Sequence, residues 1–89
     1  ANFTGIIDLH YQQKDKQKIP VSILELQVQK LMHYIDRAIY FEKEEVKIIH
    51  GKGDGILKNK IYDQLKTLPQ KHSLYLSTDG GTSILKLKY

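Results

Sequence analysis

Eighty-nine residues suffice for one domain with a single core, and a composition of 40% hydrophobic and 27% charged residues predicts a globular fold rather than disorder. The absence of cysteine excludes a disulfide framework, a thiolate zinc site and a cysteine nucleophile. No apolar run approaches the roughly 20 residues needed to span a bilayer, and a net charge of +4, carried almost entirely by lysine, favours a polyanionic partner.

The first element is predicted to be a strand over residues 4–10, where isoleucine and leucine precede a polar stretch. Asp8 and His10 are two residues apart, so a strand would turn both side chains to one face. One alternative for Asp8 is that it only accepts a hydrogen bond from a neighbouring backbone amide. Residues 11–20 are polar and basic, and we expect an exposed loop there.

A long amphipathic helix is predicted next. Ser22 and Glu25 have the spacing of a capping box, which places the start of the helix at Ser22 and its end near Phe41. Apolar residues at helical spacing form one stripe, which we interpret as core: Leu24, Val28, Leu31, Met32, Ile35, Ala38 and Ile39. His33 is expected at the surface or at its boundary with the core.

The second half of the chain is predicted to contain a strand over 46–50, a glycine-rich loop over 51–55, a helix over about 56–68 and a hairpin of strands over 73–77 and 83–89. In the last strand, Leu85, Leu87 and Tyr89 would share one face. The order β-α-β-α-β-β predicts an α/β fold with a two-layer mixed sheet, parallel in its helix-linked strands and antiparallel in the hairpin.

The first two strands both end in a histidine. Parallel strands bring their carboxyl ends to the same edge of a sheet, and ligands of open α/β sheets bind outside that edge. We therefore expect His10 and His50 to face a common crevice, with Asp8 one step deeper. The three side chains lack the local spacing of a zinc site, so no metal is predicted from spacing.

The glycine-rich loop lies at the same edge. Gly51, Gly53 and Gly55 would let backbone amides approach a ligand, the following helix offers its N-terminus, and Lys52 adds a positive charge, which together predict a phosphate cradle. The sequence matches neither a Walker A motif nor a dinucleotide fingerprint. An ordinary tight turn is the alternative, and Asp54 would cap the helix but repel a phosphate.

Residues 7–10 and 49–58 closely resemble the two signature motifs of the Smr (small MutS-related) domain. The resemblance covers nearly the whole chain. It implies a fold similar to the C-terminal domain of bacterial translation initiation factor three, binding to DNA or RNA, and endonuclease activity in several members.

The resemblance also assigns residues by position. Asp8 and His10 match the motif linked to cleavage, although Ile7 replaces its leucine. His50, Gly51, Lys52 and Gly53 match the loop linked to nucleic-acid contact, and Lys58 matches a basic position usually held by arginine. The long stretch 11–19 resembles a subgroup found at the C-terminus of larger bacterial proteins, so we expect residues 1–89 to be one domain of a longer chain with further domains upstream.

Three hypotheses follow. The first is a cytoplasmic module that binds structured or branched DNA or RNA, with phosphates contacted by Lys52, Lys58, Lys14, Lys16 and Lys18. The second is an endonuclease, in which Asp8 orients a histidine or holds a metal-bound water, His10 or His50 is the general acid or base, and Mg²⁺ or Mn²⁺ is the cofactor. The third is a protein-interaction module with a non-catalytic crevice and the loop 11–18 as its contact surface.

Overall fold

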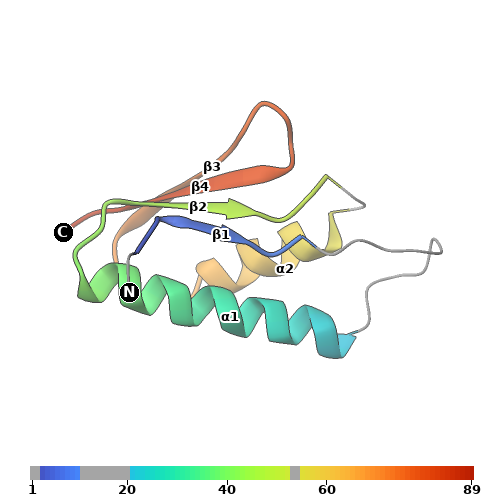
Figure 1. Cartoon of the computed structure of the whole chain (residues 1–89), viewed down its shortest axis with the longest axis horizontal. Coiled ribbons are helices and arrows are strands. Elements are labelled where there is room, and N and C mark those ends of the chain that lie inside the picture. Colours follow the sequence, from blue (N-terminus) through green and yellow to red (C-terminus); the bar gives the residue numbers. More distant parts are fainter. Residues whose placement is uncertain (1–2, 11–20, 53–54) are drawn as a thin grey trace.

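The computed structural model describes residues 3–10, 21–52 and 55–89. Within these ranges the chain forms four strands and two helices: β1 (Ile6–Asp8), α1 (Val21–Tyr40), β2 (Glu45–Ile49), α2 (Ile56–Leu65), β3 (His72–Leu76) and β4 (Thr82–Leu87) (Figure 1). The predicted α/β class and the order β-α-β-α-β-β are confirmed.

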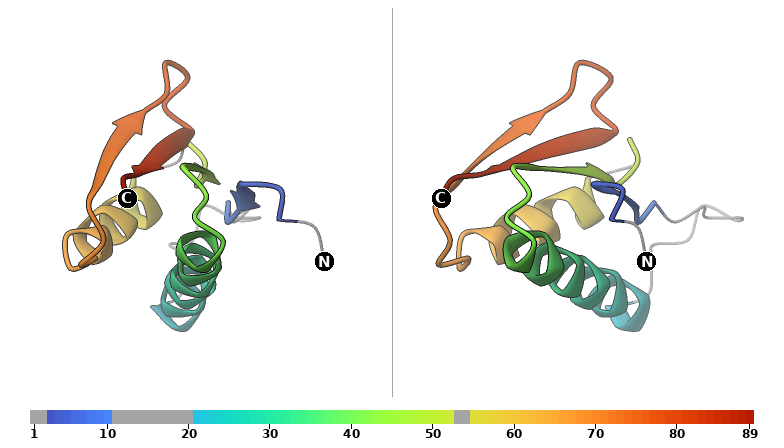
Figure 2. Two further views of the ribbon diagram at one scale, coloured as in Figure 1. Left: turned by 90° about the vertical axis from the view of Figure 1, so that its left-hand side faces the viewer. Right: turned by 60° about the vertical axis from the view of Figure 1, so that its left-hand side comes forward.

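The strands form one mixed sheet in the order β1-β2-β4-β3. β1 and β2 are parallel, whereas β4 is antiparallel to both of its neighbours. Both helices lie on the same side of this sheet, and the views from two further directions agree (Figure 2). The molecule therefore has two layers, with one sheet face packed on helices and the other left open by the described elements.

The core fills the space between the sheet and the helices. The predicted stripe of α1 is confirmed, since Leu24, Val28, Leu31, Ile35 and Ala38 are buried and Met32 and Ile39 are partly buried against them. In α2 the buried residues are Leu57, Ile61 and Leu65, and Leu68 joins them just after the helix ends. Burying a side chain of this size stabilises the fold by about 1.5–3 kcal/mol relative to exposure.

Alternation along the strands separates the two faces of the sheet. In β2, Val46 and Ile48 are fully buried on the helix side while Lys47 between them is exposed. In β4, Leu85 and Leu87 are buried on one face, as predicted, and Lys86 between them is exposed. Tyr89, predicted on the same face, lies beyond the end of β4 and is 59% exposed. The period of two therefore identifies which side chains reach the open face.

Some boundaries differ from the sequence-based prediction. β1 has only the three residues Ile6–Asp8, so both Thr4 and His10 lie beyond its ends. The capping box was wrong in its detail: α1 already includes Val21, so Ser22 is inside the first turn and cannot be the N-cap, which requires non-helical dihedral angles.

No helix in the described part of the chain combines the length and the apolar character that crossing a membrane requires.

Candidate functional site

The ends of β1 and β2 meet at one edge, as predicted. Asp8 is level with Ile49 in the parallel register, and the ladder continues one step further because the Leu9 amide donates to the Ile49 carbonyl at 2.7 Å. On the opposite side, Gln27 of α1 donates from Nε2 to the Leu9 carbonyl at 3.0 Å. The segment that carries Asp8 and His10 is thus fixed by β2 and by α1.

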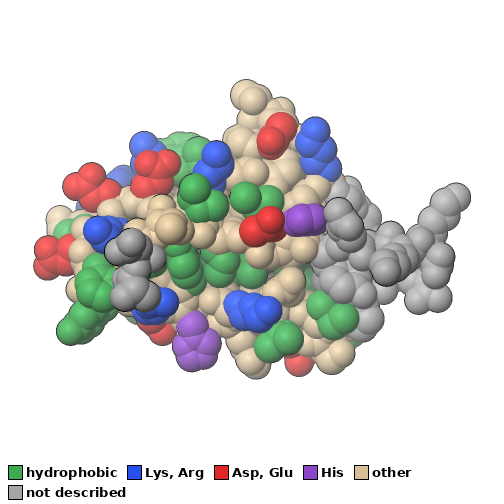
Figure 3. Space-filling model, in the orientation of Figure 1, with side chains coloured by type: hydrophobic (Ala, Val, Ile, Leu, Met, Phe, Trp, Pro, Cys, Tyr) green, Lys and Arg blue, Asp and Glu red, His purple; other side chains and the backbone are tan. Residues whose placement is uncertain are grey.

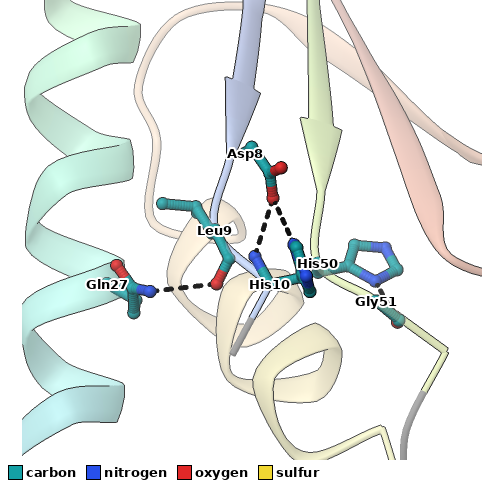
Figure 4. Close-up of polar contacts among 6 residues, drawn as sticks. All are labelled: Asp8, Leu9, His10, Gln27, His50 and Gly51. Carbon is teal, nitrogen blue, oxygen red and sulfur yellow. Dashed lines mark hydrogen bonds and ion pairs between the residues drawn. The ribbon is translucent and has the colours of Figure 1, made fainter. Parts of the chain in front are cut away.

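Asp8 and His10 form a bonded pair at this edge. The Oδ1 atom of Asp8 lies 2.7 Å from His10 Nδ1 and also accepts the His10 backbone amide at 3.1 Å (Figure 4). The contact with the ring is the one expected of an Asp–His pair, and the contact with the amide is the structural role that the sequence left open as an alternative for Asp8. Asp8 makes both contacts through the single oxygen Oδ1.

The pair is open to solvent: 54% of the Asp8 side chain and 41% of the His10 side chain are exposed. Asp8 is therefore not the deeper member that the sequence predicted. The pKa of the Asp8 carboxyl is lowered from its ordinary value of 3.8, first by the side-chain hydrogen bond from His10 and then by the His10 amide. Asp8 is consequently ionised throughout the neutral range.

His50 is on the other face of the sheet, so the predicted crevice shared by His10 and His50 was wrong. Both strands end at the same edge, but extending the register places His50 beside Leu9 rather than beside His10. Leu9 and His50 are 1% and 5% exposed and point toward the helix layer, whereas Asp8 and His10 point to the open face.

The imidazole of His50 has a hydrogen-bond partner at each nitrogen. Nδ1 lies 3.0 Å from the Gly51 carbonyl, drawn in Figure 4, and Nε2 lies 2.8 Å from Ser83 Oγ. Ser83 Oγ in turn lies 2.7 Å from the Tyr62 hydroxyl. A carbonyl can only accept, so Nδ1 carries the proton, and in the neutral ring Nε2 accepts from Ser83.

The start of the glycine-rich loop is tied to the turn before β4. The His50 and Gly51 amides both donate to the Gly81 carbonyl, at 3.1 and 2.9 Å. Gly51 has a positive φ of 85°, and a Cβ there would lie 3.3 Å from His10 Cβ. Glycine is therefore favoured at position 51 both by backbone conformation and by the proximity of His10. The Gly51 amide already donates to the Gly81 carbonyl.

The end of the loop brings a lysine back to the start of α2. Gly55 is the N-cap residue, with φ 83° and no side-chain cap. An added Cβ at Gly55 would lie 4.0 Å from the Lys58 Cε atom, so the Lys58 side chain extends over the beginning of the helix. Gly53 and Asp54 lie outside the described residues, as do Lys14, Lys16 and Lys18. The phosphate cradle remains a prediction.

Lys52 is exposed and runs along the turn before β4. Its Cγ atom would lie 3.2 Å from a Cβ built at Gly81. Asp79 in that turn accepts hydrogen bonds from Ser77 Oγ at 2.5 Å and from the Gly81 amide at 2.8 Å. These bonds lower the pKa of the Asp79 carboxyl, and the positive charges of Lys52 and Lys47 lower it further by smaller amounts. Because its neighbour Gly51 lies against His10, Lys52 is at the same end of the molecule as the Asp8–His10 pair.

Sequence reasoning missed the residues that support the site. Gln27, Ser83 and Tyr62 were given no role in the site. A buried serine in a strand of leucines is a signal for such a partner, because a buried hydroxyl needs a hydrogen bond. Among the described residues, no group of three or more histidine, aspartate or glutamate side chains could hold a metal ion.

Comparison with known proteins assigns the family. The Smr domain family model matches residues 24–85, from the first turn of α1 into β4. Asp8 and His10 precede the matched stretch. The solved Smr domain of Thermus thermophilus MutS2 has the same fold, with a TM-score of 0.68 over 94% of this chain and 98% of that chain at 20% identity.

Among curated proteins, similar sequences are named endonuclease MutS2. The protein from Clostridium tetani is 43% identical over 53 residues, 57% of this chain, and that from Clostridium novyi is 41% identical over 59 residues, 62% of this chain. The matched segments are only 7% and 8% of those proteins. The similarity is therefore to one small domain of much larger proteins.

Proposed function

This chain belongs to the Smr domain family, and from that premise we propose that it binds DNA or RNA and cleaves the strand at the Asp8–His10 pair. The observation that carries the proposal is the 2.7 Å contact between Asp8 Oδ1 and His10 Nδ1 on an exposed sheet edge. An ionised carboxylate bonded to one ring nitrogen fixes the tautomer and leaves the other nitrogen for proton transfer.

In this mechanism His10 is the general base. Asp8 accepts from Nδ1–H, so the lone pair of a neutral ring is at Nε2. Nε2 takes the proton from the attacking water or hydroxyl as its oxygen bonds to phosphorus, and the bond to the leaving oxygen breaks as that oxygen takes a proton from solvent. General acid–base catalysis of this kind contributes roughly 10²- to 10⁴-fold.

A divalent cation fits only with the help of the substrate. Asp8 contributes one carboxylate at the site, and among the described residues no group of three or more aspartate, glutamate or histidine side chains could hold a metal ion. Mg²⁺ commonly uses one or two protein carboxylates and completes its shell with phosphate oxygens and water. If the reaction uses Mg²⁺ or Mn²⁺, Asp8 would hold the ion, which would supply charge neutralisation at the phosphate.

We assign His50 a positioning role in place of proton transfer. Its ring is buried, and its nitrogens are bonded to Gly51 and Ser83. Through Gly51, which lies against His10, the buried histidine fixes the backbone beside the reactive pair. Lys52 and Lys58 would bind phosphates around this edge, together with Lys14, Lys16 and Lys18 of the polar segment.

The test is incubation of the purified chain with end-labelled branched DNA and structured RNA, in Mg²⁺, Mn²⁺ or chelator. Asp8→Asn and His10→Gln should lose cleavage by 100-fold or more and keep binding. His33→Gln, which changes an exposed histidine of α1, is the matched control and should cut normally.

Cleavage by both site variants at the wild-type rate would exclude the pair as catalytic. Salt-sensitive binding without cleavage would reduce the function to binding. Absence of both would favour the protein-interaction module.

A further inference from the structure

One row of side chains crosses the whole open face of the sheet. Ile6 is level with Lys47, Lys47 with Ile84, and Ile84 with Tyr75. Because paired residues point to the same face, all four project away from the helices. Both helices lie on the other side, so the described elements do not cover this row (Figure 2).

The row is unusual for a face that meets water. Ile6 and Tyr75, at the two ends of the row, are 51% and 53% exposed. Ile84, which lies between Lys47 and Tyr75, is half-buried. In the space-filling view, hydrophobic and lysine side chains lie side by side over the strands (Figure 3). Exposed apolar side chains at both ends of a row, with an exposed cation between them, are compatible with a binding surface on this face.

The same face leads to the Asp8–His10 pair. One row nearer the strand ends, Asp8 is level with Ile49, and Ile49 with Thr82. Rows on one face are two residues apart, or roughly 7 Å, and four strands span roughly 14 Å. Tyr75 and the reactive pair are therefore at opposite corners of one small, continuous surface.

Resting on the proposed function, we propose that this open face binds an unpaired, single-stranded segment of the nucleic acid and guides it to Asp8 and His10. A base stacks on Tyr75, Lys47 contacts a phosphate, and the isoleucines contact sugars and base faces. In the next row the exposed Lys86 is paired in register with the exposed Glu45, so Lys47 is the cation on which the phosphate contact depends.

The chemistry of the row favours an unpaired strand over a duplex. An exposed tyrosine ring binds the face of a base, and in a duplex those faces are already stacked. Lys47 lies between two isoleucines, which suits a ligand that alternates apolar bases with charged phosphates. A protein partner with an apolar face would have to bury the Lys47 charge without a partner.

The test measures anisotropy of a fluorescent single-stranded oligonucleotide and of its duplex with the whole chain. Tyr75→Ala should weaken single-strand binding roughly 5- to 150-fold, the loss expected for one stacked base, and leave duplex binding unchanged. Tyr75→Phe should retain single-strand binding, because the aromatic ring is kept. Tyr40→Ala is the matched control, since Tyr40 is 81% exposed at the end of α1.

A charge test runs beside it. Lys47→Gln should lower the slope of log affinity against log salt by about 0.7 for a single strand. Lys30→Gln, an exposed lysine of α1, should leave the slope unchanged. Amide NMR spectra of each variant report that the fold is intact.

The outcomes separate the two proposals. Wild-type binding that Tyr75→Ala and Lys47→Gln leave unchanged within twofold would overturn the open-face site and leave the nuclease proposal standing. Loss of cleavage in Asp8→Asn, with single-strand binding still dependent on Tyr75, would support both. Absence of nucleic-acid binding by the wild type would overturn both.

Discussion

The Nε2 atom of His50 lies 2.8 Å from Ser83 Oγ, a contact that joins the end of β2 to β4 in the interior of the protein. Ser83 also contacts the Tyr62 hydroxyl of α2 at 2.7 Å. The ring reaches the Gly51 carbonyl through its other nitrogen. A chain of hydrogen bonds therefore runs from α2 to the backbone beside His10.

Ser83→Ala tests this series of hydrogen bonds, because it should lower the free energy of unfolding. Ser83 is fully buried, and its loss removes the partner of both His50 and Tyr62. A buried polar group without a partner costs about 1–3 kcal/mol, whereas Tyr62→Phe removes one bond and should cost about 0.5–1.5 kcal/mol. Urea unfolding provides the comparison, with Ser73→Ala on the open face as control. Equal stability of Ser83→Ala and the wild type would show that these hydrogen bonds contribute nothing to the free energy of unfolding.

Gly51→Ala should be more harmful than Gly80→Ala, although both glycines have positive φ, 85° and 75°. The left-handed conformation costs a residue with a Cβ about 1–2 kcal/mol at either position. At Gly51 the new Cβ would also lie 3.3 Å from His10 Cβ, whereas at Gly80 nothing lies within 4 Å. Thermal unfolding and cleavage should both show the difference. Equal effects in the two variants would contradict the close approach of Gly51 to His10.

Helical and strand periods made most of the fold predictable. The apolar spacing in α1 and the alternation around Leu85 depend only on local geometry, and both are confirmed by burial. The helix start was less predictable, because Ser22 has capping chemistry in sequence but already lies within the helix.

The candidate site was predictable only in part. Parallel pairing of β1 and β2 correctly placed Asp8, His10 and His50 at one edge of the sheet. Their side chains separate because register is a long-range property: a shift of one residue moves a side chain to the other face. The sequence alone does not determine which residue of β1 pairs with Ile49. It therefore could not show that His50 would be buried beside Leu9.

The Asp8 carboxyl should titrate below its ordinary pKa of 3.8, because hydrogen bonds from the His10 side chain and amide stabilise the ionised form. A lowered folded-state pKa contributes stability above the unfolded pKa, and that contribution is lost as pH falls through the folded value. His10→Ala removes the larger cause but keeps the backbone amide, so the NMR midpoint of Asp8 should rise and still remain below 3.8. An unchanged midpoint would mean that the ring contact does not persist in solution.

Lys52 and Lys58 should each contribute to the salt dependence of binding if the glycine-rich loop approaches the phosphates. Lys52, within the loop, lies beside Gly81 in the turn before β4, and Lys58 of α2 extends over Gly55 at the end of the loop. Each Lys→Gln change should lower the slope of log affinity against log salt by about 0.9 for duplex DNA. The double variant should lower it by the sum, because the slope is proportional to the number of phosphates that are neutralised.

The matched control is the exposed Lys30→Gln on α1, measured between about 50 and 200 mM salt, an interval over which several phosphate contacts change affinity by orders of magnitude. A slope that falls for Lys47→Gln but not for Lys52→Gln or Lys58→Gln would place the phosphates on the open face alone. In that case the loop would serve only to fix the backbone beside His10, which is the role that the buried His50 and the engaged Gly51 amide already support.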